Sequence, residues 1–160
     1  MKKLLIAITF LLALIEGNSQ DIKKIKVTDL EKTIKESNGP LIINFWATFC
    51  KPCIEEIPYF LDAINAHRKD SVKLLLVSLD LHDDYPKIKP LAIKRKFDTP
   101  IVWLNETNAD YFCPKVDSLW SGSLPATLFV NNKTGYRKFY EEPVKKEKLE
   151  NEIMAILGHQ

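Results

Sequence analysis

The sequence predicts an α/β protein in which helices cover both faces of a central mixed sheet. Two apolar runs, Leu41–Trp46 and Val72–Ser78, suit strands buried on both faces. The segment between them has helical spacing, and residues 126–157 have the pattern of a hairpin followed by a helix. A strand, a helix and a second strand in this order form a right-handed unit with parallel strands. The residues between this unit and the hairpin form an insertion after the second core strand.

Residues 1–19 have the pattern of a secretory signal peptide. Two lysines precede the apolar stretch Leu4–Ile15, which is shorter than the roughly 20 residues of a membrane span. Gly17 and Ser19 supply small residues before a cut at Gln20. We therefore expect export to the periplasm or another extracytoplasmic compartment, with an uncleaved membrane anchor as the alternative.

Residues 20–160 have the length of one domain with a single core. The chain carries 23 basic and 21 acidic residues, a formal net charge of +2 at pH 7. Charges of both signs alternate in residues 145–150, as on a solvated helix face, so no nucleic-acid partner is expected. The 3 cysteines allow at most one intramolecular disulfide and leave one thiol over.

The first helix is predicted from a capping-box pattern at Thr28–Glu31 and extends to about residue 37. An Asn-Gly-Pro sequence ends it and leads into the first buried strand. From Cys50, apolar residues three and four positions apart predict a second helix that reaches about His67. Pro58 lies inside this helix and, because it lacks a backbone donor, is expected to kink it.

The insertion has a less regular pattern than the segments on either side of it. Prolines interrupt residues 80–100, so only a short helix around Leu91–Phe97 is expected there. Ile101–Leu104 has the composition of a short strand, and Asp110–Trp120 is predicted to be partly helical.

The C-terminal third returns to regular structure. Ala126–Val130 is an apolar strand, and Tyr136–Tyr140 follows a turn as its hairpin partner. The segment from Lys145 to Leu157 carries apolar residues along one helical face and ends at Gly158.

The most informative motif is a pair of thiols, Cys50 and Cys53, at the junction of the first strand and the second helix. Free N–H groups and a partial positive charge at a helix N-terminus favour a thiolate. Such a setting lowers a thiol pKa from its usual value of about 8.5. Lys51 adds an exposed cation that salt would screen, and Pro52 preorganises the first turn. We therefore predict that Cys50 is the attacking thiol and Cys53 the resolving thiol one turn inside.

Two segments give the chain a family resemblance: residues 44–58, around the thiol pair, and residues 120–129, around Pro125. Over roughly residues 28–157 the chain resembles the exported TlpA/ResA-like thiol–disulfide oxidoreductases. This resemblance implies a thioredoxin-like fold and an enzyme that reduces protein disulfides, with the disulfide of the thiol pair as its only redox group. It also implies an upstream thiol electron donor, which a membrane protein could supply.

The same resemblance assigns a second part of the site. Pro125 corresponds to a cis-proline beside the redox pair, and the backbone of Leu124 would pair with a client peptide in the manner of a strand. A trans proline that merely begins a strand is the alternative. Trp46 and Phe49 could line a substrate groove, although Trp46 suits the core beneath the active-site turn equally well.

Three residues depart from the family pattern. Phe49 stands where tryptophan is usual, Asn44 replaces the buried aspartate of ordinary thioredoxins, and Cys113 has no counterpart. Without that aspartate, Glu56 and Asp80 are candidate proton carriers for the resolving thiol. The alternatives are a helix-surface carboxylate for Glu56 and a loop cap for Asp80.

Other functions fit the thiol pair less well. A copper or other metal-binding module is the main alternative, but no histidine is spaced as a third ligand, so no metal site is predicted. In a thiol peroxidase a threonine is expected three residues before the cysteine, whereas Thr48 lies two before Cys50. Cys113 is expected to be a small buried apolar residue, with a second redox thiol as the alternative.

Overall fold

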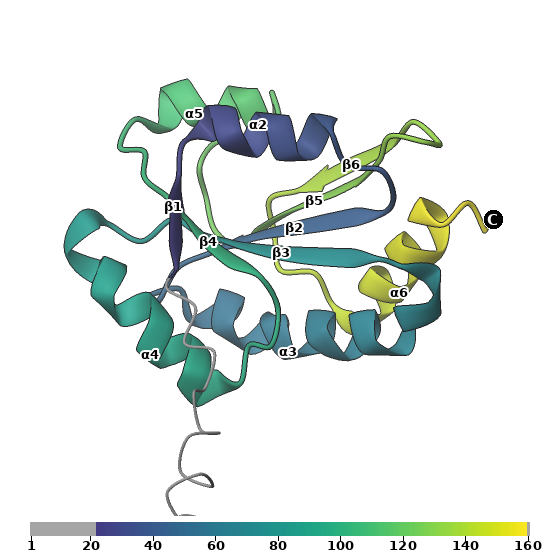
Figure 1. The fold of residues 1–160 in the computed structure, drawn as a ribbon, viewed down its shortest axis with the longest axis horizontal. Helices are drawn as coiled ribbons and strands as arrows, with labels where there is room; N and C mark the ends of the chain where they lie inside the picture. The colour runs from purple at the N-terminus through teal and green to yellow at the C-terminus, as the bar shows by residue number, and fades with distance from the viewer. Residues whose placement is uncertain (1–21, 160) are drawn as a thin grey trace, which may run out of the picture.

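The fold is built on one six-stranded sheet with helices on both faces (Figure 1). The computed structural model describes residues 22–159, so the predicted signal peptide and its cleavage site lie outside the described residues. Within that range, no helix combines the length and the apolar character needed to cross a membrane. The strands lie in the spatial order β1-β4-β3-β2-β5-β6. Their bounds are β1 Lys23–Ile25, β2 Leu41–Trp46, β3 Lys73–Ser78, β4 Ile101–Leu104, β5 Ala126–Asn131 and β6 Tyr136–Tyr140.

The sheet is mixed, as the sequence predicts. Strands β1, β4, β3 and β2 run parallel to one another. Strand β5 pairs with β2 in antiparallel fashion, and β6 pairs with β5 in antiparallel fashion. Strand β2 lies between β3 and β5, so all six of its residues are buried. This central position explains its uninterrupted apolar run. It also places the carboxyl end of β2, and the redox motif that follows it, between neighbouring strands rather than at the side of the sheet.

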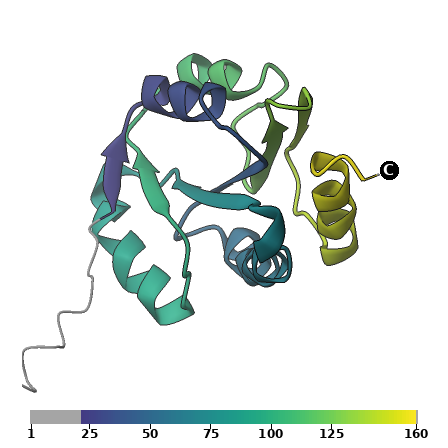
Figure 2. The same ribbon diagram turned by 45° about the vertical axis from the view of Figure 1, so that its right-hand side comes forward.

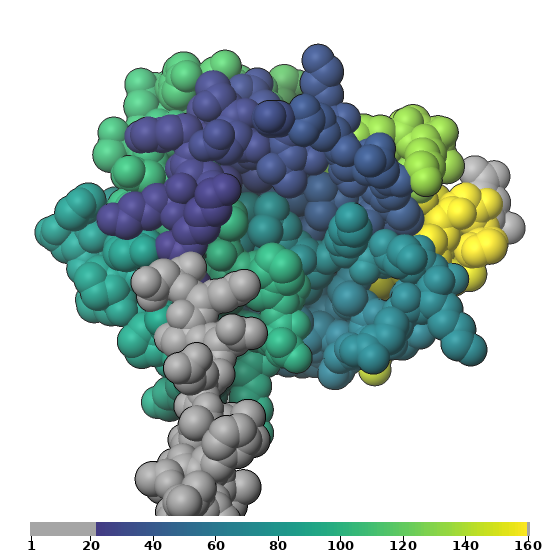
Figure 3. Space-filling model, in the orientation of Figure 1, coloured from purple at the N-terminus to yellow at the C-terminus, as the bar shows by residue number. Residues whose placement is uncertain are grey.

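Among residues 22–159, five α-helices pack against the sheet. They lie on both of its faces, as the two ribbon views show (Figures 1 and 2). Helices α2 (Val27–Lys35) and α5 (Ala109–Val116) pack on one face. Helices α3 (Lys51–Ala66), α4 (Tyr85–Arg95) and α6 (Lys146–Ile156) pack on the other. In the space-filling view, the purple and blue residues of β1 and α2 lie on one side of the visible face, and the yellow residues of α6 lie at its edge (Figure 3).

The side chains of β2 alternate between two cores, as the pleat of a strand requires. Ile42 and Trp46 belong to the core under α3, α4 and α6. Ile43 and Phe45 belong to the core under α2 and α5. The strand therefore joins both halves of the interior.

Helix α4 corrects the expectation of a short helix around residues 91–97, because it begins at Tyr85 and ends at Arg95. Pro86 lies in the first turn of the helix, where a missing N–H group costs nothing. Pro90 lies inside the helix but does not end it. The prediction placed this helix too late in the sequence because it treated both of these prolines as helix breakers.

The N-terminal elements also differ from expectation. Helix α2 is capped by Lys26, whose backbone N–H donates to the Asp29 carboxylate at 2.9 Å, so Thr28 does not cap the helix. Strand β1 was not predicted, since its three residues include two exposed lysines and give no alternating pattern.

Candidate active site

The thiol pair lies at the N-terminus of α3. Cys50 is the N-cap residue, and its Sγ accepts the backbone N–H of Cys53 at 3.3 Å. A disulfide joins the two residues, with an S–S distance of 1.99 Å. Cys50 retains 8 % of its surface, whereas Cys53 is fully buried. In this arrangement only Cys50 is open to an incoming molecule.

The turn around the pair presents one large apolar side chain to solvent. Phe49 is 64 % exposed. Lys51 is also exposed, and its ammonium group lies 3.8 Å from the Glu55 carboxylate. Pro52 occupies the first turn of α3, where its lack of an N–H leaves no donor unpaired.

A cleft of about 670 Å³ opens directly beside Cys50. One wall is the turn at residues 49–52, and another is formed by Leu79 and Leu81, which follow β3. The remainder comes from residues 106–112 around the start of α5 and from Gly122 and Leu124. Most of these side chains are apolar, so the cleft offers a mainly apolar surface next to Cys50.

The loop before β5 brings Leu124 into this cleft. The Leu124–Pro125 peptide bond is cis, and Pro125 itself is buried. Trp46 is fully buried and packs edge-on against Phe97, with ring centroids 5.6 Å apart. The groove interpretation is therefore wrong for Trp46, and the alternative of a core residue applies.

Glu56 is buried one helical turn after Cys53, on the same buried side of α3. Its carboxylate accepts from Asn44 Nδ2 at 2.8 Å and from the backbone N–H of Val144 at 2.8 Å. Burial raises the pKa of Glu56 to about 7, although both hydrogen bonds act in the opposite direction. The alternative of a helix-surface carboxylate is therefore wrong. A carboxyl with this pKa exchanges protons near neutrality.

Asp80 is also buried, but its oxygens hold neighbouring chain in place. They accept the backbone N–H of Thr48 at 3.0 Å, the Thr48 hydroxyl, and the Ser78 hydroxyl at 2.7 Å. The residue thus ties the segment that leads to Cys50 to the end of β3. The Thr48 hydroxyl therefore donates to Asp80.

Cys113 is the one free thiol among the described residues, and it is buried. Burial, together with the negative charges of Glu141 and Asp110, raises its pKa to about 11. The thiol is therefore protonated at neutral pH and a poor nucleophile.

Several contributors to this site were not predicted from the sequence. Leu79, Leu81 and Phe112 form cleft walls, and Thr127 and Val144 complete the network around Asn44 and Glu56. Leu79 and Leu81 carried a signal, since apolar residues just past the carboxyl end of a parallel strand lie where such sheets bind ligands. The others meet the site only through long-range packing.

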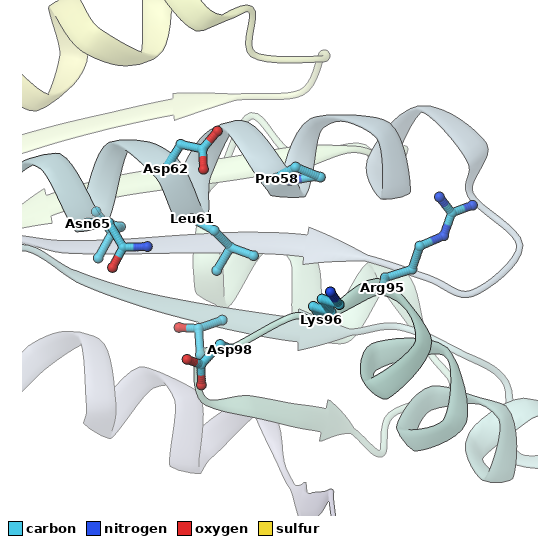
Figure 4. A pocket seen from close by; sticks show the side chains of 9 residues that line it. Pro58, Leu61, Asp62, Asn65, Arg95, Lys96 and Asp98 are labelled. Atoms are coloured by element: carbon cyan, nitrogen blue, oxygen red, sulfur yellow. The ribbon is translucent and has the colours of Figure 1, made fainter.

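A second hollow, of about 270 Å³, lies between α3 and the connection from α4 to β4 (Figure 4). Its lining carries charges of both signs from Asp62, Arg95, Lys96 and Asp98. Neither cysteine of the redox pair lines it. Within residues 22–159, no group of three or more His, Cys, Asp or Glu side chains could hold a metal ion.

Known proteins resemble this chain in both sequence and structure. Sporulation thiol-disulfide oxidoreductase A of Bacillus subtilis is 35 % identical over 71 residues, which cover 44 % of this chain and 43 % of that protein. Thiol-disulfide oxidoreductase ResA of Geobacillus thermodenitrificans is 25 % identical over 118 residues, which cover 72 % of this chain and 62 % of that protein. The chain therefore spans less than two thirds of either relative.

A solved structure shares the architecture. The thioredoxin-related protein from Neisseria meningitidis serogroup B superposes with a TM-score of 0.66 at 25 % identity, covering 78 % of this chain and 90 % of that one. The predicted thioredoxin-like fold is thus confirmed, and the predicted enzyme class is the one named in the two sequence relatives. Residues 8–135, most of the sequence, match the AhpC/TSA family. The chain therefore belongs to the AhpC/TSA family.

Proposed function

We propose that the protein is an extracytoplasmic thiol–disulfide oxidoreductase that reduces protein disulfides. The observation that carries this proposal is the placement of Cys50 and Cys53 at the N-terminus of α3, with Cys50 facing an apolar cleft and Cys53 buried behind it. The names of the sequence relatives support the reaction class. The reducing direction and the export rest on the sequence resemblance and on the N-terminal pattern.

The reaction begins with the reduced pair. The Cys50 thiolate attacks one sulfur of a client disulfide, so that a Cys50–client bond forms, the client S–S bond breaks, and one client thiolate leaves. The partial positive charge at the start of α3 favours the attacking thiolate. A client backbone lying along the cleft would pair with the chain at Leu124, next to Pro125.

The second step releases the client. Cys53 loses its proton and attacks Cys50 Sγ, which re-forms the Cys50–Cys53 disulfide and expels the second client thiolate. We assign Glu56 as the group that takes this proton, because it is buried one turn from Cys53 and has a pKa of about 7. Asp80 is the weaker candidate, since its oxygens already accept hydrogen bonds from three donors. An upstream thiol donor then returns two electrons to the disulfide.

Insulin reduction with dithiothreitol as electron donor tests the proposal. Wild-type protein should accelerate the reduction of insulin, and a Cys50→Ser, Cys53→Ser double variant should not. Titration of the reduced protein with Cu(I) is the comparison, because two soft thiolates are also copper ligands. Tight 1:1 copper binding without insulin reduction would favour the metal-binding alternative.

A further inference from the structure

The loop from residue 117 to Pro125 forms one wall of the cleft and is held from two sides. Gly122 and Leu124 line the cleft. Behind them, the buried Trp120 ring packs against Phe45 with centroids 4.4 Å apart, and its Nε1 donates to the Ser123 carbonyl at 3.1 Å. The Trp120 contacts anchor the side of the loop that faces the core. The opposite side of the loop, which faces solvent, depends on a different residue.

Glu141, the first residue after β6, holds that solvent side. Its carboxylate accepts the backbone N–H of Ser121 at 3.1 Å, the Ser121 hydroxyl at 2.6 Å and the backbone N–H of Ser123 at 2.7 Å. The donors flank Gly122, whose φ of +99° turns the chain at this point. One carboxylate thus gathers three donors from residues two positions apart.

These contacts are of a strong type. A hydrogen bond to an ionised carboxylate is shorter and roughly twice as strong as one between neutral groups. Although partial desolvation acts to raise it, the hydrogen bonds from Ser121 and Ser123 hold the pKa of Glu141 below its ordinary value. The group is therefore ionised at neutral pH, where it retains all three contacts.

We propose that Glu141 is a positioning residue that fixes residues 121–124 against the cleft and thereby sets the affinity for protein clients. It takes no part in electron transfer, since its contacts are with Ser121 and Ser123 rather than with the thiol pair. This inference rests on the proposed function for its effect on clients. The neighbouring Glu142 pairs instead with Lys148 on α6 at 2.6 Å, which makes it a matched control.

The kinetic test compares Glu141→Ala, Glu141→Gln and Glu142→Gln with wild type. We expect Glu141→Ala to raise the KM for insulin at least fivefold and to change kcat less than twofold. Reaction of the reduced protein with a small aromatic disulfide should stay within twofold, because that probe needs only the thiols. Glu141→Gln should fall between wild type and Glu141→Ala, since its amide oxygen keeps one acceptor, and Glu142→Gln should match wild type.

An unchanged KM for insulin in Glu141→Ala would overturn the inference, as would an equal loss of rate toward both disulfides. Amide hydrogen exchange separates this failure from failure of the proposed function. Faster exchange at Ser121 and Ser123 is expected in Glu141→Ala but not in Glu142→Gln, whether or not insulin is a client. Unchanged exchange would show that Glu141 does not hold the loop, whereas wild type inactive toward every disulfide would overturn only the proposed function.

Discussion

Glu56 is a carboxyl group whose burial gives folding stability a specific pH dependence. The pKa of Glu56 is about 7 in the folded protein, against an ordinary value of 4.5. Between these two pH values the folded state holds more protons than the unfolded chain. The contribution of this group to stability therefore falls as pH rises from about 4.5 to about 7, and it stays at its lower value above that range.

Glu56→Gln should remove this dependence, because an amide does not titrate. From pH 4 to pH 8, the free energy of unfolding of wild type should fall relative to the variant by up to about 3 kcal/mol. Urea denaturation at several pH values measures the difference. Glu55→Gln is the control, since the Glu55 side chain is 63 % exposed. If the difference in the free energy of unfolding between wild type and Glu56→Gln does not change with pH, the raised pKa of Glu56 is contradicted.

Cys113 should be dispensable for turnover. Its thiol is buried, protonated at neutral pH and outside the disulfide. We expect Cys113→Ala to keep insulin reduction within about twofold of wild type, with a modest loss of stability, because alanine keeps a small apolar side chain. A tenfold loss of turnover, or a peptide map of the oxidised protein dominated by a link to Cys113, would instead place this thiol in the redox path.

At the scale of single elements, α6 is held to the sheet by one face. Ile153 is fully buried in the core that α6 shares with α3, whereas the next residue, Met154, is 42 % exposed. Truncating a buried isoleucine to alanine leaves a cavity and typically costs 2–5 kcal/mol. Ile153→Ala should therefore lower the free energy of unfolding by about 2–4 kcal/mol.

Met154→Ala provides the comparison within the same helix and should stay within about 1 kcal/mol of wild type. Chemical denaturation of both variants, with the disulfide intact, measures the two values. Equal losses for Ile153→Ala and Met154→Ala would mean that α6 does not pack through this face.

Strands and helices with strong patterns could be predicted from the sequence. The apolar runs of β2 and β3 and the turn between β5 and β6 are local signals, and these elements lie where they were expected. Helix α4 was misplaced because Pro86 lies in the first turn, where a helix tolerates proline, and because Pro90 lies inside the helix without ending it. Strand β1 depends on pairing with β4, a contact that its own three residues do not encode.

The site likewise has parts that local sequence patterns predict and parts that depend on long-range contacts. The thiol pair could be recognised because its spacing and flanking elements are local in sequence. The partners of Glu56 lie 12 residues away at Asn44 and 88 residues away at Val144, so the fold alone brings them together. The contact between Glu141 and Ser121 crosses 20 residues and likewise gave no sequence signal.

For the whole molecule, the proposed export makes a prediction about the N-terminus. If residues 1–19 are a signal peptide, protein purified from its native cells should begin at or near Gln20 and come from the extracytoplasmic fraction. N-terminal sequencing of fractionated cells provides the measurement. An intact Met1 on protein from the cytoplasm would contradict export.

The central claim concerns the division of labour between the two thiols, and trapping of mixed disulfides tests it most directly. Cys53→Ser should leave Cys50 able to attack clients but unable to release them, because no second thiol remains to attack Cys50 Sγ. Non-reducing gels of cells that express this variant should therefore show adducts that disappear on reduction, and cells with Cys50→Ser should show none. Equal adducts from both variants, or none from either, would contradict the account.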